Sequence, residues 1–126
     1  MAHVTFARRV FIIAGIYGVA VILPMFFLES KMNIDFPPPM NHPEHYYAFA
    51  GVTLAWQVLF FFIASDPVRF RKIMIPCMLE KLSLVPAFFI LYFRGQFPEL
   101  WIPLLLIDLV LGSFFFVSYR RTASEV

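Results

Sequence analysis

Four long apolar stretches constrain most strongly what this chain can fold into. They cover residues 10–28, 46–64, 73–93 and 100–119, and each holds 19 to 21 residues. At about 1.5 Å per residue, such a helix is roughly 28 to 32 Å long, which matches a hydrocarbon layer about 30 Å thick. Backbone polar groups in lipid must bond within their own segment, and none of the four stretches alternates apolar with polar residues. We therefore expect membrane-spanning helices rather than strands.

The composition supports a single membrane domain. Of 126 residues, 61% are hydrophobic and 14% are charged, whereas about a quarter of a soluble domain is charged. One cysteine excludes an internal disulfide and a thiolate zinc module. A net charge of +2 and the lack of a basic run argue against nucleic acid as a partner, and no motif for a cofactor is present. The sequence predicts an all-α, polytopic four-transmembrane-helix bundle that forms one domain over residues 1–126.

The basic residues predict the orientation of the spans. Two of them, Lys31 and Arg94, lie at one set of span ends, and seven lie at the other set: Arg8, Arg9, Arg69, Arg71, Lys72, Arg120 and Arg121. By the positive-inside rule, both termini and the loop 66–72 are expected in the cytoplasm. No small-x-small cleavage pattern follows the first stretch, so we expect it to be retained as a span rather than cleaved as a signal peptide.

Prolines and a glycine predict where the helices bend or end. Pro24, Pro76, Pro86 and Pro103 lie within spans, where each removes a backbone donor and is expected to kink the helix or free a carbonyl. Gly95 can end the third helix.

Three ionisable residues lie inside the predicted spans, namely Glu80, Lys81 and Asp108. A charge at the bilayer centre costs about 2.5 to 3.5 kcal/mol on insertion scales, so such residues are functional candidates by default. Adjacent helical residues point about 100° apart, so Glu80 and Lys81 are expected to need separate partners. We predict that Lys81 pairs with Asp108 and that Glu80 pairs with Gln57, which lies at about the same depth. The simpler alternative is that these polar residues only hold the helices together.

A second group of polar residues lies before the second span. His42 and His45 could meet on one helix face, and Glu44 could contribute an oxygen to a metal ion. A third firm ligand is missing, however. The pattern favours a helix start without a metal, in which Asn41 or His42 caps the helix and Pro43 occupies its first position.

Two segments, 66–72 and 76–81, resemble in order and placement those of small bacterial four-span membrane proteins of the DoxX-like kind. This resemblance implies a left-handed four-helix bundle in a bacterial inner membrane, without an assigned reaction. The chain also resembles the emopamil-binding-protein-like fold, whose enzymes isomerise sterol double bonds with intramembrane acids. It departs from that pattern because no histidine lies in its spans, so no catalytic role is carried over.

The sequence therefore favours a non-enzymatic integral membrane protein with an intramembrane polar site formed by Gln57, Glu80, Lys81 and Asp108. That site would bind or transport a small amphiphile, an ion or a proton, with membrane lipid around it. Because four spans enclose little space, we expect a homo-oligomer or assembly with other membrane subunits. Two alternatives remain open: an accessory subunit of a larger membrane complex, and an intramembrane isomerase that uses Glu80 or Asp108 as acid and base.

Overall fold

The computed structural model describes residues 1–126 and is helical apart from short loops. The first half comprises α1 (Ala2–Ile22), the 3₁₀ turn η1 (Leu23–Phe27), the short helix α2 (Glu29–Asp35) and α3 (Pro43–Ser65). The second half comprises η2 (Arg71–Ile73), α4 (Met74–Leu82), α5 (Leu84–Phe93), η3 (Glu99–Trp101), α6 (Ile102–Arg121) and η4 (Thr122–Glu125). The all-helical prediction is confirmed.

Four helical segments are long and apolar enough to cross a membrane, which indicates a membrane protein. They are Ala2–Phe27, Pro43–Ser65, Arg71–Phe93 and Glu99–Glu125. Each overlaps one of the predicted spans.

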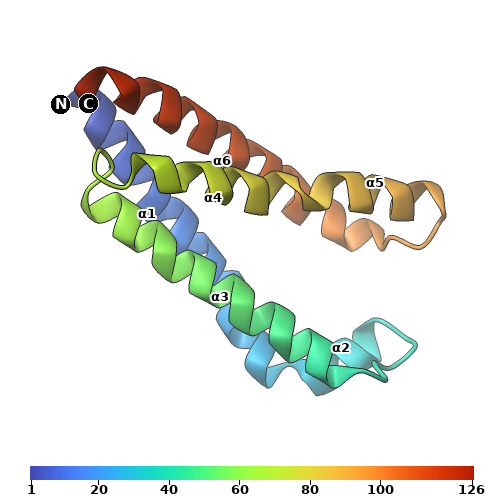
Figure 1. Ribbon diagram of the computed structural model, residues 1–126. Coiled ribbons are helices and arrows are strands. Elements are labelled where there is room, and N and C mark those ends of the chain that lie inside the picture. The colour runs from blue at the N-terminus through green and yellow to red at the C-terminus, as the bar shows by residue number, and fades with distance from the viewer.

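The helices are arranged as two pairs that diverge from one end (Figure 1). Helix α1 packs along α3, and α4 packs along α6. The pairs are joined mainly by the packing of α1 against α6, whereas α3 and α4 are in contact over only a few residues. Both ends of the chain lie where the pairs meet (Figure 1). The helices therefore do not surround one continuous central core, and the arrangement is more open than a compact bundle.

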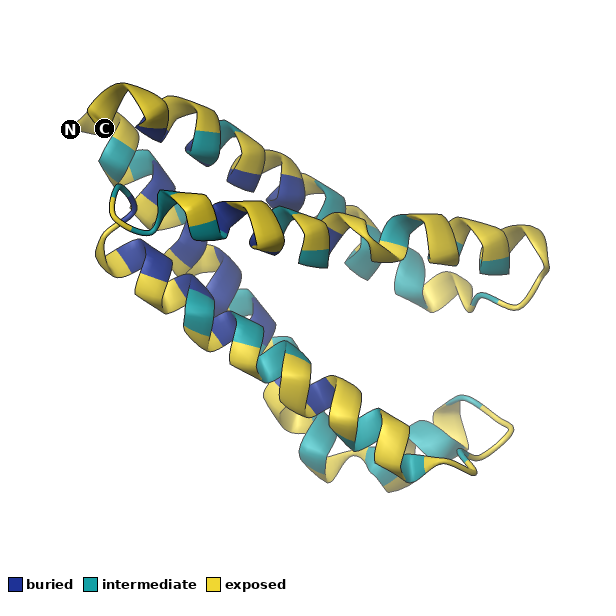
Figure 2. Ribbon diagram, in the orientation of Figure 1, coloured by how far each residue is buried: buried dark blue, intermediate teal, exposed yellow.

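The buried core lies near the end where the pairs meet (Figure 2). Phe11 of α1 stacks on Phe115 of α6, with ring centroids 4.3 Å apart. Phe60 of α3 meets Phe115 edge-on at 5.1 Å. All three rings are fully buried. Since aromatic contacts of this kind add to the energy of apolar burial, these rings hold three of the four spans together.

Two arginines stabilise helix ends at the same side of the molecule. The Nε of Arg8 donates to the carbonyl of Ala64 near the end of α3, at 3.0 Å. The Nε of Arg71 donates to the carbonyl of Tyr119 near the end of α6, also at 3.0 Å. The last carbonyls of a helix have no partner within the helix and carry the negative end of its dipole, so a guanidinium suits both positions.

Replacing Arg71 with glutamine is expected to destabilise the protein by about 1 kcal/mol, because the guanidinium also lies 3.8 Å from the centroid of the Tyr119 ring. Unfolding of the purified protein by sodium dodecyl sulfate, followed by circular dichroism, measures the effect. The matched control is Lys72→Gln, which removes an exposed charge from the next residue. Equal losses in the two variants would show that only the net charge matters.

The prolines act in two different ways. Pro24 falls in η1, where α1 ends. Pro86 has no N–H to donate to the carbonyl of Leu82, and the helix is interrupted between α4 and α5 at Ser83. Pro76 and Pro103 were expected to disturb spans as well. They instead lie in the first turns of α4 and α6, where a missing donor costs nothing.

Gly95 follows the end of α5, as expected, with φ at +67°. Its N–H donates to the carbonyl of Tyr92, and the N–H of Gln96 donates to the carbonyl of Leu91. This is the Schellman pattern, which glycine favours because it adopts positive φ without strain.

The segment between η1 and α3 is more ordered than the sequence predicts, because it contains α2. Three hydrogen bonds stabilise this end of the molecule, and the one from Tyr47 links α2 to α3. The hydroxyl of Tyr46 donates to the carbonyl of Met25 at 2.6 Å, and the hydroxyl of Tyr47 donates to Glu29 at 2.6 Å. The backbone N–H of Met40 donates to the side chain of Asn33 at 2.9 Å. This segment is therefore a structured cap at the end of the molecule opposite the termini.

Candidate functional site

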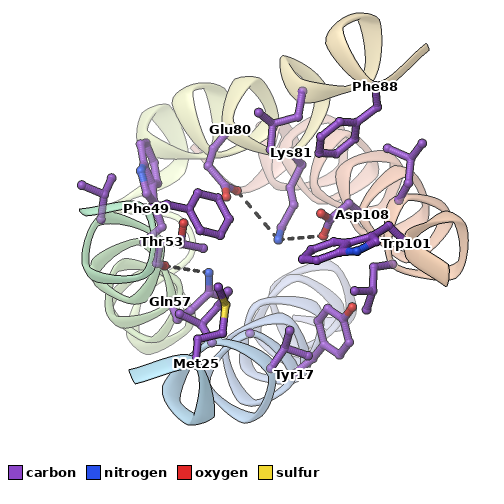
Figure 3. A pocket seen from close by; sticks show the side chains of 18 of the residues that line it. Tyr17, Met25, Phe49, Thr53, Gln57, Glu80, Lys81, Phe88, Trp101 and Asp108 are labelled. Carbon is purple, nitrogen blue, oxygen red and sulfur yellow. Dashed lines mark hydrogen bonds and ion pairs between the residues drawn. The ribbon is translucent and has the colours of Figure 1, made fainter. Parts of the chain in front are cut away.

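A cavity of about 590 Å³ lies between the two helical pairs (Figure 3). Of its 23 lining residues, 16 are hydrophobic, so most of its wall is apolar. The polar part of the wall includes all four residues that the sequence singled out, Gln57, Glu80, Lys81 and Asp108. The fold thus brings them to one cavity from α3, α4 and α6.

Lys81 and Asp108 form the ion pair that the sequence predicts. The ammonium of Lys81 donates to Oδ1 of Asp108 at 3.0 Å and joins α4 to α6 (Figure 3). The side chain of Lys81 is 5% exposed and that of Asp108 is 27% exposed. The ammonium also lies 5.6 Å from the centroid of the Phe60 ring. The charged group therefore adjoins the aromatic core.

Glu80 approaches Lys81 more closely than its position on the helix suggested. Its Oε2 lies 3.8 Å from the Lys81 ammonium, and both side chains line the cavity. The prediction that they face different places is wrong, because two long side chains can converge although their Cα–Cβ bonds point apart. The 3.8 Å separation is too long for a hydrogen bond. Oε2 of Glu80 is buried and has no hydrogen-bond donor.

The predicted pairing of Gln57 with Glu80 is wrong. The amide nitrogen of Gln57 donates instead to the carbonyl of Thr53, one turn earlier in α3, at 2.9 Å. Its oxygen is buried without a donor and lies against Gly18 of α1. Gln57 thus bonds within α3 and packs against α1. Glu80 is left without a polar partner apart from Lys81.

The cavity is open on the side where α3 and α5 diverge. Phe49 and Val52 of α3 and Leu84 of α5 line it and are still 45%, 61% and 37% exposed. At the end far from the termini, the ring of Phe36, which follows α2, lies 6.1 Å from the ring of Trp101 in η3. The cavity therefore has a lateral opening and an aromatic contact at its outer end.

His42, Glu44 and His45 form an exposed group at the start of α3. One ligand atom of each lies within 4.8 Å of the others. Nδ1 of His42 lies 2.9 Å from Oε1 of Glu44. His42 occupies the capping position of α3, with Pro43 next, but its side chain makes no capping bond, so that part of the prediction is wrong.

Sequence reasoning missed the aromatic part of the cavity wall. Trp56 and Trp101, the only two tryptophans of the chain, both line the cavity. It also missed three methionines, Met25, Met32 and Met40, which gather at the outer end. Neither residue type stands out in so apolar a sequence, and no local pattern could have located them.

No family model matches this chain, and no curated protein or solved structure is significantly similar to it.

Proposed function

We propose that this chain is a non-enzymatic integral membrane protein that binds a small amphiphile in the cavity between its helical pairs. The observation that carries the proposal is the buried Oε2 of Glu80, which has no donor in the wall of a largely apolar cavity. A buried acceptor without a partner is costly, so a ligand that supplies a donor gains free energy there.

The charges of the site favour a cationic head group. Glu80 and Asp108 carry two carboxylates, and Lys81 carries the single ammonium among the lining residues. Lys81 donates to Asp108 and stands farther from Glu80. A ligand ammonium beside Glu80 would balance the second carboxylate and form a charge-assisted hydrogen bond. An amphiphilic amine therefore fits the site better than a fatty acid.

The remaining wall suits an apolar tail. Aromatic and aliphatic side chains of α3, α5 and α6 also line the cavity, among them Phe49, Phe88 and Leu104. The lateral opening lets such a tail enter from the hydrocarbon layer without crossing water. A cavity of about 590 Å³ lies within the range of natural small-molecule sites, roughly 300 to 1,000 Å³.

Tryptophan fluorescence tests this proposal directly, because both tryptophans line the cavity. We expect dodecylamine to change the emission of the full-length protein saturably and dodecanoate to bind much more weakly. In Glu80→Gln the affinity for dodecylamine is expected to fall about tenfold or more, because a charge-assisted hydrogen bond becomes a neutral one. Native mass spectrometry gives the stoichiometry.

The matched control is Glu99→Gln, which removes an exposed carboxylate that does not line the cavity. It is expected to bind dodecylamine as the unaltered protein does. Equal affinities in Glu80→Gln and the unaltered protein, or a linear rather than saturable response, would contradict the proposal.

An intramembrane isomerase is the second candidate function. The observation that favours it is a substrate-sized cavity with two carboxylates in its wall, one of which has no hydrogen-bond donor. In such a reaction one carboxylic acid delivers a proton to an alkene carbon while a carboxylate removes another. Incorporation of deuterium from D₂O into an alkene amphiphile, lost in Glu80→Gln, would separate this activity from binding.

The proposed setting is a bacterial inner membrane with both termini in the cytoplasm. Seven basic residues at the end that holds the termini support this orientation. The outer faces of the spans carry exposed apolar side chains that do not line the cavity, among them Ile13, Phe62 and Phe116. We propose that they contact lipid and a second copy of the chain, which native mass spectrometry would detect together with bound ligand.

A further inference from the structure

A second hollow of about 420 Å³ lies at the outer end of the molecule, next to the amphiphile cavity. It is lined by three methionines and two histidines that come from three separate parts of the chain: Met25, Met32, Met40, His42 and His45. These five are half of the chain's six methionines and two of its three histidines. Neither lysine nor arginine lines the hollow.

We propose that this hollow binds a soft monovalent cation, and specifically Cu(I), through the thioether sulfurs and the imidazoles. Thioether and imidazole ligands together select Cu(I), because soft sulfur donors favour soft metals. Zn²⁺ and hard cations instead prefer thiolate, imidazole and oxygen ligands, and thioether is a poor ligand for them. The sulfur content of the hollow thus determines the class of metal.

The methionines supply what the local sequence lacks. His42 and His45 are only three residues apart, their ring centroids lie 5.4 Å apart, and no third firm ligand follows nearby in the sequence. The fold brings Met25 from η1, Met32 from α2 and Met40 from the loop before α3 to the same hollow. The set of ligands becomes complete only when the chain has folded.

Hydrogen bonds hold the three parts of the chain in place without using the ligand atoms. The hydroxyl of Tyr46 donates to the carbonyl of Met25, and the side chain of Asn33 accepts from the N–H of Met40. Both bonds engage the backbone and leave the thioethers free. The backbone at Met25 and Met40 is therefore fixed before a cation binds, which lowers the entropy lost on binding.

Two neighbouring groups would further stabilise a bound cation. Oε1 of Glu44 lies 2.9 Å from Nδ1 of His42, so the carboxylate can orient the ring and direct Nε2 to the metal. This carboxylate also adds negative charge beside the ligands. Trp101 lines the hollow as well, and the face of an indole ring attracts cations.

Competition with bicinchoninate under anaerobic, reducing conditions tests the proposal on the full-length protein in detergent. We expect one Cu(I) per chain and quenching of tryptophan emission, which Trp101→Phe should largely remove. Met40→Leu is the decisive variant, because Met40 lines only the outer hollow and leucine conserves its volume. Its affinity for Cu(I) is expected to fall by roughly 10- to 100-fold, by analogy with the loss of supporting groups at metal sites.

The control is Met78→Leu, which changes a methionine elsewhere in the chain and is expected to bind Cu(I) unchanged. Circular dichroism and dodecylamine binding verify that Met40→Leu is folded and keeps the inner cavity. Equal Cu(I) affinities in Met40→Leu, Met78→Leu and the unaltered protein would overturn the proposal. The proposal would also be overturned if Zn²⁺ bound as tightly as Cu(I), and if His42→Asn removed that Zn²⁺ binding while Met40→Leu did not. In that case His42, Glu44 and His45 would be sufficient ligands.

Discussion

Replacing Lys81 with methionine is expected to lower the free energy of unfolding by about 3 kcal/mol, the largest stability loss among substitutions in the cavity wall. The ammonium of Lys81 lies between two carboxylates, 3.0 Å from Asp108 and 3.8 Å from Glu80. Without it, two neighbouring acidic groups face each other in an apolar cavity. The loss is expected at the lower end of the range for broken buried pairs, because the side chain of Asp108 is 27% exposed. Unfolding by sodium dodecyl sulfate, followed by circular dichroism, measures the loss.

A second variant separates the loss of the pair from the loss of the lysine. In the double variant Lys81→Met with Asp108→Leu, apolar groups replace both partners of the 3.0 Å pair, and part of the lost stability is expected to return because Glu80 no longer faces a second carboxylate. The exposed Lys72→Met serves as the control for removing a lysine. If Lys81→Met were as stable as the unaltered protein, the ion pair would contribute nothing to holding α4 against α6.

Replacing Gly18 with alanine is expected to destabilise the protein by about 2 kcal/mol, because a Cβ at this position would overlap the side chain of Gln57. The Gln57 amide is itself held by the carbonyl of Thr53 and is fully buried, so it has little room to move. Either Gln57 loses its hydrogen bond or α1 and α3 move apart. Either outcome alters this wall of the cavity, because Gly18 and Gln57 both line it.

Gly51→Ala is the matched control on α3, since nothing lies within 4 Å of its added Cβ. It is expected to be neutral or to stabilise the protein by up to about 1 kcal/mol, because alanine favours helix. The double variant Gly18→Ala with Gln57→Ala removes the overlap and is expected to recover stability relative to Gly18→Ala. If the double variant were no more stable than Gly18→Ala, the added Cβ would have to clash with a residue other than Gln57.

The four long apolar helices could be predicted, because their length and apolar composition are visible in the sequence. The pairing of those helices could not. It depends on contacts between distant residues, such as Phe11 with Phe115 and the Arg8 guanidinium with the carbonyl of Ala64. Helix α2 was missed for a related reason. Its seven residues form no apolar run, and the bond from Tyr47 to Glu29 that fixes it spans 18 residues.

The depth of a residue in a span could be predicted more reliably than its direction around the helix. Counting residues placed Lys81 and Asp108 at neighbouring levels, and the pair forms. The same count placed Gln57 level with Glu80, but Gln57 bonds to its own helix. Side-chain bonds within a helix compete with bonds between helices. The depth of a residue in the span does not show which of the two it forms. The second hollow could not be predicted from the sequence, because Met25, Met32 and Met40 come together only in the tertiary structure.

The side opening between α3 and α5 has a consequence for how affinity is expressed. If a guest molecule reaches the cavity from the bilayer, occupancy follows its mole fraction among the lipids and not its molarity in buffer. Adding more lipid at constant total guest dilutes that reservoir and empties the cavity. Dissociation constants obtained in nanodiscs and in micelles then become comparable only after each is divided by the concentration of lipid or detergent in the sample.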